Sequence, residues 1–133
     1  AGEEGPPEYI WEALNLLEVK RIDHGVQCLK DKKLVKKLKN DQTPLTVCPL
    51  SNVKLCVFDN LNQHNLKKML DEKLMVTINS DDPAYFGGYI NDNLIESQIA
   101  LNLSMDEIKT LIINSFKSAF LKEETKKEWI GKI

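Results

Sequence analysis

The sequence predicts an α/β fold with about three parallel strands and a helical C-terminal end. Two observations support this class. Short β-prone apolar segments alternate with segments whose apolar residues recur every three or four positions, which is typical of βαβ units and of a parallel sheet. Beyond about residue 90 only the helical periodicity remains. Three strands are too few to close a barrel, so we expect an open piece of a larger sheet.

The first part of the chain supplies two helices and two strands. Pro6 and Pro7 are placed to open a helix, because a proline in the first turn loses no hydrogen bond. Residues 19–22 predict a short strand, and residues 45–48 predict a buried one. Asp31 is a predicted N-cap for the helix between them. The predicted inner faces of these helices carry Ile10, Trp11, Leu14, Leu17, Leu34, Val35 and Leu38.

The second part predicts one more strand and several helices. After residues 45–48 we expect a loop that reaches about His64, then a short helix, then a strand at residues 75–80. Ser104 and Glu107 have the spacing of a capping box at the start of a later helix. Residues 125–130 form a last amphipathic segment. The predicted apolar stripes are Leu66, Met69 and Leu70, then Leu94, Ile95 and Ile99, then Ile108, Leu111, Ile112, Phe116, Ala119 and Phe120.

Composition limits the possible functions. The chain has 133 residues and a net charge of −2, which argues against bulk electrostatic binding to nucleic acid or to an acidic membrane. The lysine-rich stretch at residues 30–39 is interpreted as the solvated face of a helix. The chain has three cysteines, an odd number, and no Cys-x-x-Cys pair. We therefore expect these thiols to be buried apolar residues and the protein to lie in the reducing cytoplasm.

Three sets of polar residues are candidates for chemistry. Asp81 and Asp82 follow a predicted strand, where parallel α/β folds place their ligands, although Asp-Asp-Pro is also an ordinary turn composition. His24 also follows a strand, and it is interpreted as a base, an oxyanion stabiliser, a metal ligand or a buried histidine bonded to the main chain. Glu3 lies between glycines before a helix. It is interpreted either as a general acid or as a favourable charge at the start of the helix. His64 is interpreted as a surface or capping residue.

The aromatic run at residues 85–89 follows the aspartate pair. It is placed either to wall a planar ligand or to pack against the next helix, and the sequence leaves both interpretations open.

Taken in order, four segments resemble the adenosine/adenine deaminase family. The resemblance covers essentially the whole chain, and the stretch Asp82–Tyr89 is most similar to the adenine deaminase branch. The four segments are Ala1-Gly2-Glu3, Arg21-Ile22-Asp23-His24-Gly25, Cys48-Pro49-Leu50-Ser51-Asn52 and Asn79-Ser80-Asp81-Asp82-Pro83.

The resemblance implies a fold, a reaction and roles. Residues 1–133 would be the C-terminal part of a single (β/α)8 TIM barrel domain that converts adenine to hypoxanthine and ammonia in purine salvage, with one Zn²⁺ per full-length subunit. Glu3 would protonate purine N1, and His24 would hold the attacking water and assist its deprotonation. Asp81 would be a zinc ligand, and Asp82 would hydrogen-bond purine N7.

One departure from the family pattern qualifies these expectations. The family holds its zinc with His-x-His, a third histidine just before Ala-Gly-Glu, and the aspartate, whereas these 133 residues contain no His-x-His. We therefore expect the N-terminal strands of the barrel as a partner, and an incomplete zinc site and no turnover in this piece alone. The expected ligand is a small purine, with no nucleic acid and no membrane. Adenosine deaminase and a non-catalytic α/β interaction module are the alternatives.

Overall fold

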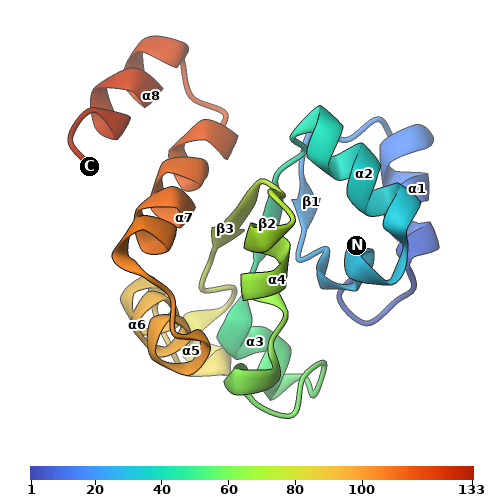
Figure 1. Cartoon of the computed structure of the whole chain (residues 1–133), viewed down its shortest axis with the longest axis horizontal. Helices are drawn as coiled ribbons and strands as arrows, with labels where there is room; N and C mark the ends of the chain where they lie inside the picture. Colours follow the sequence, from blue (N-terminus) through green and yellow to red (C-terminus); the bar gives the residue numbers. More distant parts are fainter.

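A computed structural model describes residues 1–133 and shows three short parallel strands at the centre of the chain (Figure 1). They are β1 (Ile22–Asp23), β2 (Leu45–Val47) and β3 (Val76–Ile78), in the spatial order β1-β2-β3. Both pairings are parallel, and Leu45 of β2 is in register with Ile22 on one side and Val76 on the other. The prediction of an α/β fold with about three parallel strands is confirmed, although each strand is shorter than the sequence indicated.

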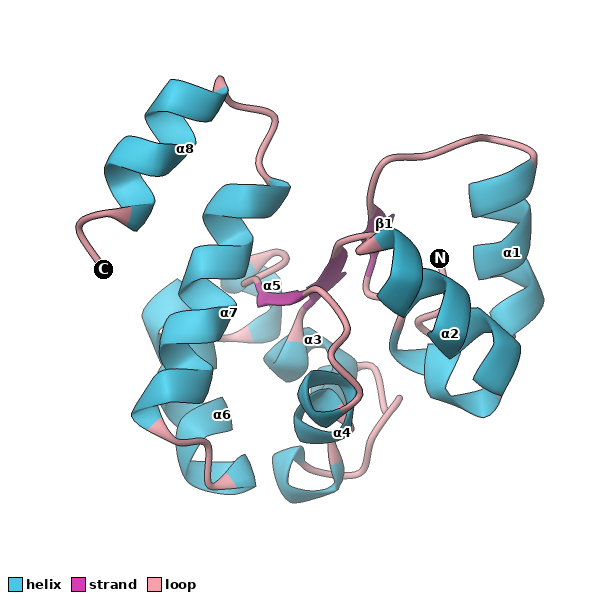
Figure 2. Ribbon diagram, turned by 45° about the horizontal axis from the view of Figure 1, so that its top comes forward, coloured by secondary structure: helices cyan, strands magenta, loops and turns pink.

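Helices surround this sheet and form the C-terminal end (Figure 2). The helices that precede or follow β1 lie at one side of the sheet, and α6 and α7 lie at the other, beside β3, with α8 next to α7 (Figure 1). None of the helices is long and apolar enough to cross a membrane. The helices are α1 (Pro7–Asn15), α2 (Lys32–Asp41), α3 (Pro49–Lys54), α4 (Leu66–Asp71), α5 (Pro83–Phe86), α6 (Ile90–Leu101), α7 (Met105–Ser118) and α8 (Glu123–Ile130), with 3₁₀ turns η1 (Val26–Lys30) and η2 (Leu61–Gln63).

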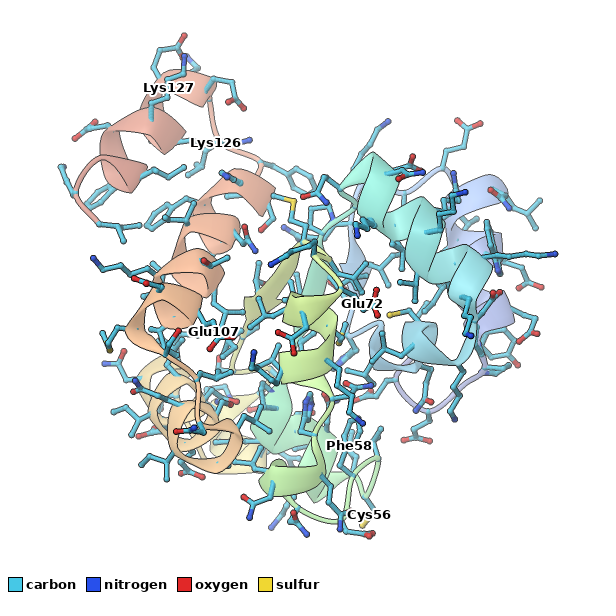
Figure 3. All side chains as sticks on the ribbon, in the orientation of Figure 1. Cys56, Phe58, Glu72, Glu107, Lys126 and Lys127 are labelled. Carbon is cyan, nitrogen blue, oxygen red and sulfur yellow. The ribbon has the colours of Figure 1, made fainter.

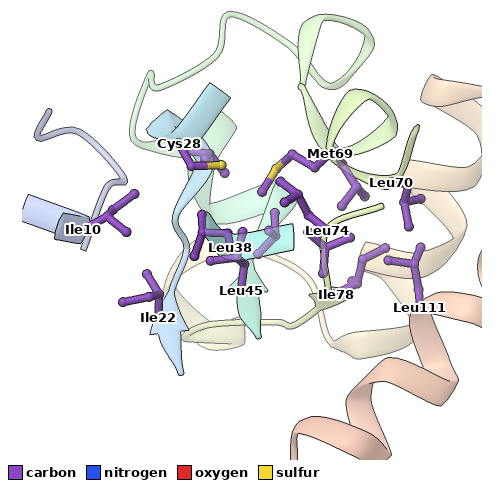
Figure 4. Packing of buried hydrophobic residues seen from close by; sticks show 14 of the residues in the cluster. Ile10, Ile22, Cys28, Leu38, Leu45, Met69, Leu70, Leu74, Ile78 and Leu111 are labelled. Atoms are coloured by element: carbon purple, nitrogen blue, oxygen red, sulfur yellow. The ribbon is translucent and has the colours of Figure 1, made fainter. Parts of the chain in front are cut away.

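The core lies between the sheet and the helices that connect its strands (Figure 4). In β2 the first and third side chains are buried and Thr46 between them is half-buried, so one face of the strand meets the core. All three residues of β3 are buried, because α7 packs directly against that strand. Burying one aliphatic side chain of this core stabilises the fold by about 2 kcal/mol. Its fully buried aliphatic members include Ile10, Leu34, Leu38, Leu45, Val47, Leu66, Val76 and Leu111.

Helix boundaries agree best with the sequence where side chains cap them. Asp31 accepts the main-chain N–H groups of Lys33 and Leu34 at 2.8 and 3.3 Å. Ser104 and Glu107 form the expected capping box, with bonds of 3.2 and 2.8 Å in the two directions. These contacts satisfy main-chain N–H groups that have no partner within the helix. On α2 the lysines lie at the outer surface as predicted, while Leu34 is buried.

Three expectations about local structure are wrong. The predicted loop between β2 and His64 contains α3, because Pro49 both ends the strand and opens a helix. Leu17 lies beyond the end of α1 and Phe120 beyond the end of α7, and both are exposed. The stripe assigned to α6 is also wrong, since Ile95 and Ile99 are exposed and the buried side of that helix carries polar residues, Asn93 and Ser97.

Two single-residue expectations also need correction. His64 is buried, with 4% of its surface exposed, and does not lie at the surface. Cys28 and Cys48 are buried as predicted, but Cys56 is exposed on the connection after α3 (Figure 3). His64 and Cys56 both lie in the connection between β2 and α4, where the sequence indicated only a loop.

Candidate active site

The carboxyl ends of the three strands lie at one edge of the sheet, and polar residues follow each of them. His24 comes directly after β1, Cys48 directly after β2, and Asp81 three residues after the end of β3. Ligands of parallel α/β folds bind at this edge. The edge opens onto a cavity of about 370 Å³ whose lining includes all three of these residues.

The first residues of the chain run beside the end of β1 and bring Glu3 to the same place. The nitrogen of Ala1 donates to the Asp23 carbonyl at 3.0 Å, and the side chain of Gln27 donates to the Glu3 carbonyl at 2.7 Å. Gly2 has a φ of +70°, and a Cβ there would lie 2.3 Å from the side chain of Ile10. Only glycine fits that turn, which is followed at once by the glutamate.

His24 lies between two carboxylates. Its Nδ1 is 3.2 Å from Oε1 of Glu3, and its Nε2 is 3.8 Å from Oδ2 of Asp81. The three side chains are 17%, 21% and 29% exposed for His24, Glu3 and Asp81, so the cluster is partly shielded yet reachable by a small ligand. The structure therefore brings together three of the four residues that the sequence singled out.

Both His24 and Asp81 have left-handed backbone, with φ values of 63° and 57°. This region is unfavourable for residues with a side chain and costs about 1 kcal/mol or more at each position. The local structure compensates for it. The N–H of His24 donates to the Thr46 carbonyl at 3.0 Å, and the carboxylate of Asp81 accepts from the Ser51 hydroxyl at 2.8 Å and from the N–H of Asp82 at 2.9 Å.

Asp82 stands apart from the cluster. Its Oδ1 accepts the N–H of Tyr85 at 3.3 Å and caps the short helix α5. The interpretation of Asp-Asp-Pro as a turn therefore also agrees with the structure. The aromatic residues that follow do not fill the core, because Tyr85 and Tyr89 are exposed. Oδ2 of Asp82 makes no hydrogen bond within the chain and stays available to a ligand.

Three polar residues near the site were missed as candidates. Ser51 and Asn52 are fully buried at the start of α3, and the amide of Asn52 donates to Oε1 of Glu3 at 2.7 Å. The oxygen of the same amide lies 3.1 Å from Nε2 of His64, whose pKa burial lowers to about 4. The sequence held one signal, since Ser51 and Asn52 follow a strand end just as His24 does.

The donor atoms present fit one side of a zinc site. A nitrogen of His24, the sulfur of Cys48 and an oxygen of Asp81 lie within 4.8 Å of one another. Burial, together with the nearby carboxylates, raises the pKa of Cys48 to about 12, so this thiol is protonated when no metal is bound. The carboxylate and the imidazole are donor types that zinc accepts, and a catalytic zinc takes about three protein ligands.

Comparisons of sequence and of structure match essentially the whole length of this chain. It is 56% identical over 133 residues to an adenine deaminase of Acinetobacter baylyi, covering 100% of this chain and 40% of that protein. The crystal structure of adenine deaminase from Arthrobacter aurescens superposes with a TM-score of 0.97 at 50% identity, over 98% of this chain and 40% of that one. A zinc-bound amidohydrolase from Burkholderia ambifaria superposes with a TM-score of 0.87 at 25% identity, over 97% of this chain and 36% of that one.

The chain thus spans about 40% of the length of the curated relatives it matches. The adenosine deaminase family model matches residues 1–133, which is the whole chain. With the strand-end cluster and the superpositions above, this match shows that the chain belongs to the adenosine deaminase family.

Proposed function

We propose that residues 1–133 are the C-terminal part of a single (β/α)8 barrel domain that hydrolyses adenine to hypoxanthine and ammonia. The observation that carries this proposal is the cluster of Glu3, His24 and Asp81 at the carboxyl ends of parallel strands. It occurs in a chain that is 56% identical to adenine deaminases over its full length. Pairing of β1 and β3 with further strands would continue the sheet.

In this reaction the residues of the cluster move protons. His24 takes a proton from the attacking water at Nε2, the nitrogen that faces Asp81, as the oxygen adds to purine C6. Glu3 gives a proton to purine N1, which prevents negative charge from building up on the ring. The amino group then leaves as ammonia with the proton from His24, and the proton of the new hydroxyl returns to Glu3. Adenine and water thus become hypoxanthine and ammonia.

Asp82 is proposed to hydrogen-bond purine N7 through its free Oδ2, which would accept the hydrogen of the N7–H tautomer of adenine. The exposed position of this carboxylate and its place in the chain beside Asp81 support that role. The cap that Oδ1 forms on α5 would hold the carboxylate in place while Oδ2 contacts the purine.

Asp81 is the residue of this chain that would hold a zinc ion, one per full-length subunit. When bound, zinc lowers the pKa of a coordinated water toward about 7 and makes hydroxide available at neutral pH. The further ligands would be histidines of the barrel strands outside these residues, since the chain has only two histidines, His24 and the buried His64. The bound zinc of the Burkholderia ambifaria amidohydrolase supports this choice of metal.

The proposed substrate is a free purine, and neither nucleic acid nor a membrane is a proposed partner. Buried free thiols at Cys28 and Cys48 suit a reducing compartment, so we place the enzyme in the cytoplasm, where it would serve purine salvage.

The test is to assay the full-length, zinc-loaded protein with adenine and adenosine side by side. We expect ammonia release from adenine with a kcat/KM at least about 100-fold above that for adenosine. Preference for adenosine would replace the proposal with nucleoside deamination. A folded, zinc-loaded protein that releases ammonia from neither would favour the non-catalytic module.

A further inference from the structure

A line of hydrogen bonds connects the start of α4 to the candidate acid, through residues with no assigned role. The main-chain N–H of Leu66 donates to Nδ1 of His64 at 3.0 Å. Nε2 of His64 lies 3.1 Å from Oδ1 of Asn52, and Nδ2 of Asn52 donates to Oε1 of Glu3 at 2.7 Å. His64 and Asn52 are buried, so neither side chain exchanges these partners for water.

The N–H of Leu66 determines where the hydrogen of His64 lies. A main-chain N–H can only donate, so Nδ1 must accept and carries no hydrogen. Burial lowers the pKa of His64 to about 4, which keeps the ring neutral at neutral pH. Its one N–H is therefore on Nε2, directed at Asn52. The ring of Phe58, 4.3 Å away between centroids, packs against this imidazole and holds it in place.

The hydrogen of His64 in turn determines how the amide of Asn52 points. A donor at Nε2 requires the oxygen of Asn52, so the NH₂ group must face the site. There it meets Oε1 of Glu3 at 2.7 Å and Nδ1 of His24 at 3.3 Å. The proposed reaction needs Nε2 of His24 free to take a proton, so Nδ1 carries the hydrogen and lies 3.2 Å from the same Oε1. The 3.3 Å approach is then a contact between two donors.

The amide nitrogen of Asn52 and the Nδ1 of His24 therefore lie against the same oxygen of Glu3. Oε1 accepts the N–H of Asn52 at 2.7 Å, and Nδ1 of His24 lies 3.2 Å from the same oxygen, so Oε1 is occupied by groups of the protein. A proton on a neutral Glu3 must then lie on Oε2. Oε2 makes no hydrogen bond within the chain.

We propose that Asn52, held by His64, is a positioning residue that occupies Oε1 of Glu3 and leaves Oε2 as the oxygen that delivers the proton to purine N1. This inference rests on the proposed function, and it adds which oxygen acts and what selects it. The proton leaves Oε2–H for N1 as water oxygen adds to C6, and it returns to Oε2 when the carbonyl of hypoxanthine forms.

Asn52→Ala in the full-length protein is the first test, with Asn60→Ala as its matched control. Asn60 is an exposed asparagine on the same connection and its side chain forms no cap. We expect kcat with adenine to fall about 100-fold in N52A, with KM within about threefold, because the acid is misplaced while the substrate is still bound. A kcat within about threefold of wild type, or a loss of kcat that follows a loss of bound zinc, would overturn the proposal.

A pair of substitutions at His64 separates positioning from folding. Glutamine can place an N–H near the position of Nε2, whereas asparagine can place an acceptor near the position of Nδ1 and cannot reach Asn52. We expect His64→Gln to keep kcat within about threefold and His64→Asn to lower it at least about tenfold, with similar losses of thermal stability. Equal losses of kcat in both variants would show that His64 matters only for folding, and the proposal would fail. If H64N does not fold, N52A decides the question.

Crystal structures of full-length wild type and N52A keep this test separate from that of the proposed function. A wild-type protein that releases no ammonia from purines would refute the proposed function alone. The positioning claim would still be decided by the Glu3 carboxyl group. It is supported if the group rotates away from the position of Asn52 in the variant, and it is contradicted if Glu3 is unchanged.

Discussion

The hydroxyl of Ser51 donates a 2.8 Å hydrogen bond to Oδ2 of Asp81 and so links the start of α3 to the segment after β3. Ser51 is fully buried, and the other oxygen of the carboxylate already accepts the N–H of Asp82 at 2.9 Å. Both oxygens of Asp81 are thus oriented by the protein itself. If Asp81 holds zinc as proposed, these outer partners would fix its direction and strengthen metal binding.

Removing this hydroxyl is expected to weaken zinc binding. Ser51→Ala in the full-length protein should lower zinc affinity by about 10- to 100-fold, because Asp81 loses the donor that orients it. Competition with a chelator of known affinity measures the change. Ser80→Ala is the control, since the hydroxyl of Ser80 meets only the Asp81 carbonyl at 3.4 Å. Equal zinc affinities in both variants would show that Ser51 does not orient Asp81 for zinc binding.

Glu3 is expected to act on the chemical step. Glu3→Gln keeps an oxygen that can accept the N–H of Asn52 but removes the acid, so kcat for adenine should fall by about 10² to 10⁴ with a small change in KM. Steady-state rates of ammonia release give both constants. Glu4→Gln, at the exposed neighbouring carboxylate, should leave them unchanged. A variant E3Q with wild-type kcat would exclude Glu3 as the acid.

His64 is expected to make stability depend on pH below about 6.5. Its pKa is lowered from 6.5 to about 4 by burial in the fold, so the unfolded chain binds the proton more readily. The stability is therefore fully present above pH 6.5 and is lost as the pH falls toward 4, by up to about 3 kcal/mol.

Thermal unfolding of the full-length protein between pH 7.5 and about 4.5 tests this pH dependence, with His64→Gln as the comparison. The wild-type midpoint should fall more steeply than that of H64Q. Parallel curves would mean that His64 titrates in the fold as it does in the unfolded chain.

Gly25 is expected to be required for the shape of the site. Its φ is +73°, and a Cβ would lie 2.8 Å from the side chain of Leu45. Gly25→Ala should lower stability by about 2 kcal/mol or more, and it should displace the adjacent His24 and reduce kcat. Gly87→Ala isolates the clash, because Gly87 has a φ of +80° but no neighbour within 4 Å of a Cβ. Chemical denaturation of both variants measures the difference, and equal losses would refute the role of the Leu45 contact.

The sequence predicted the parts of this structure whose signals are local. The cap of Asp31 and the box of Ser104 with Glu107 involve neighbours in the chain, and both are present. Strand ends were located well enough to place His24 and Asp81 at one edge of the sheet.

The remainder depends on contacts between distant segments. His64 is buried because Asn52, twelve residues earlier, offers it a buried acceptor. The spacing of apolar residues in the sequence does not predict such a polar pair. The exposed side of α6, with Ile95 and Ile99, likewise depends on which face of that helix the rest of the fold covers. The meeting of Asn52 with Glu3 spans 49 positions and arises only when the first residues run beside β1.

The left-handed backbone at His24 and Asp81 lowers the stability of the fold at two positions that the proposed reaction needs. Glycine would relax the main chain at either position and so favour the folded state, but it would remove the proposed base at position 24 or the proposed zinc ligand at position 81. In a library of variants selected only for thermal stability, glycine should therefore be enriched at positions 24 and 81. Under the proposed function, the most heat-stable variants of such a library would no longer deaminate adenine.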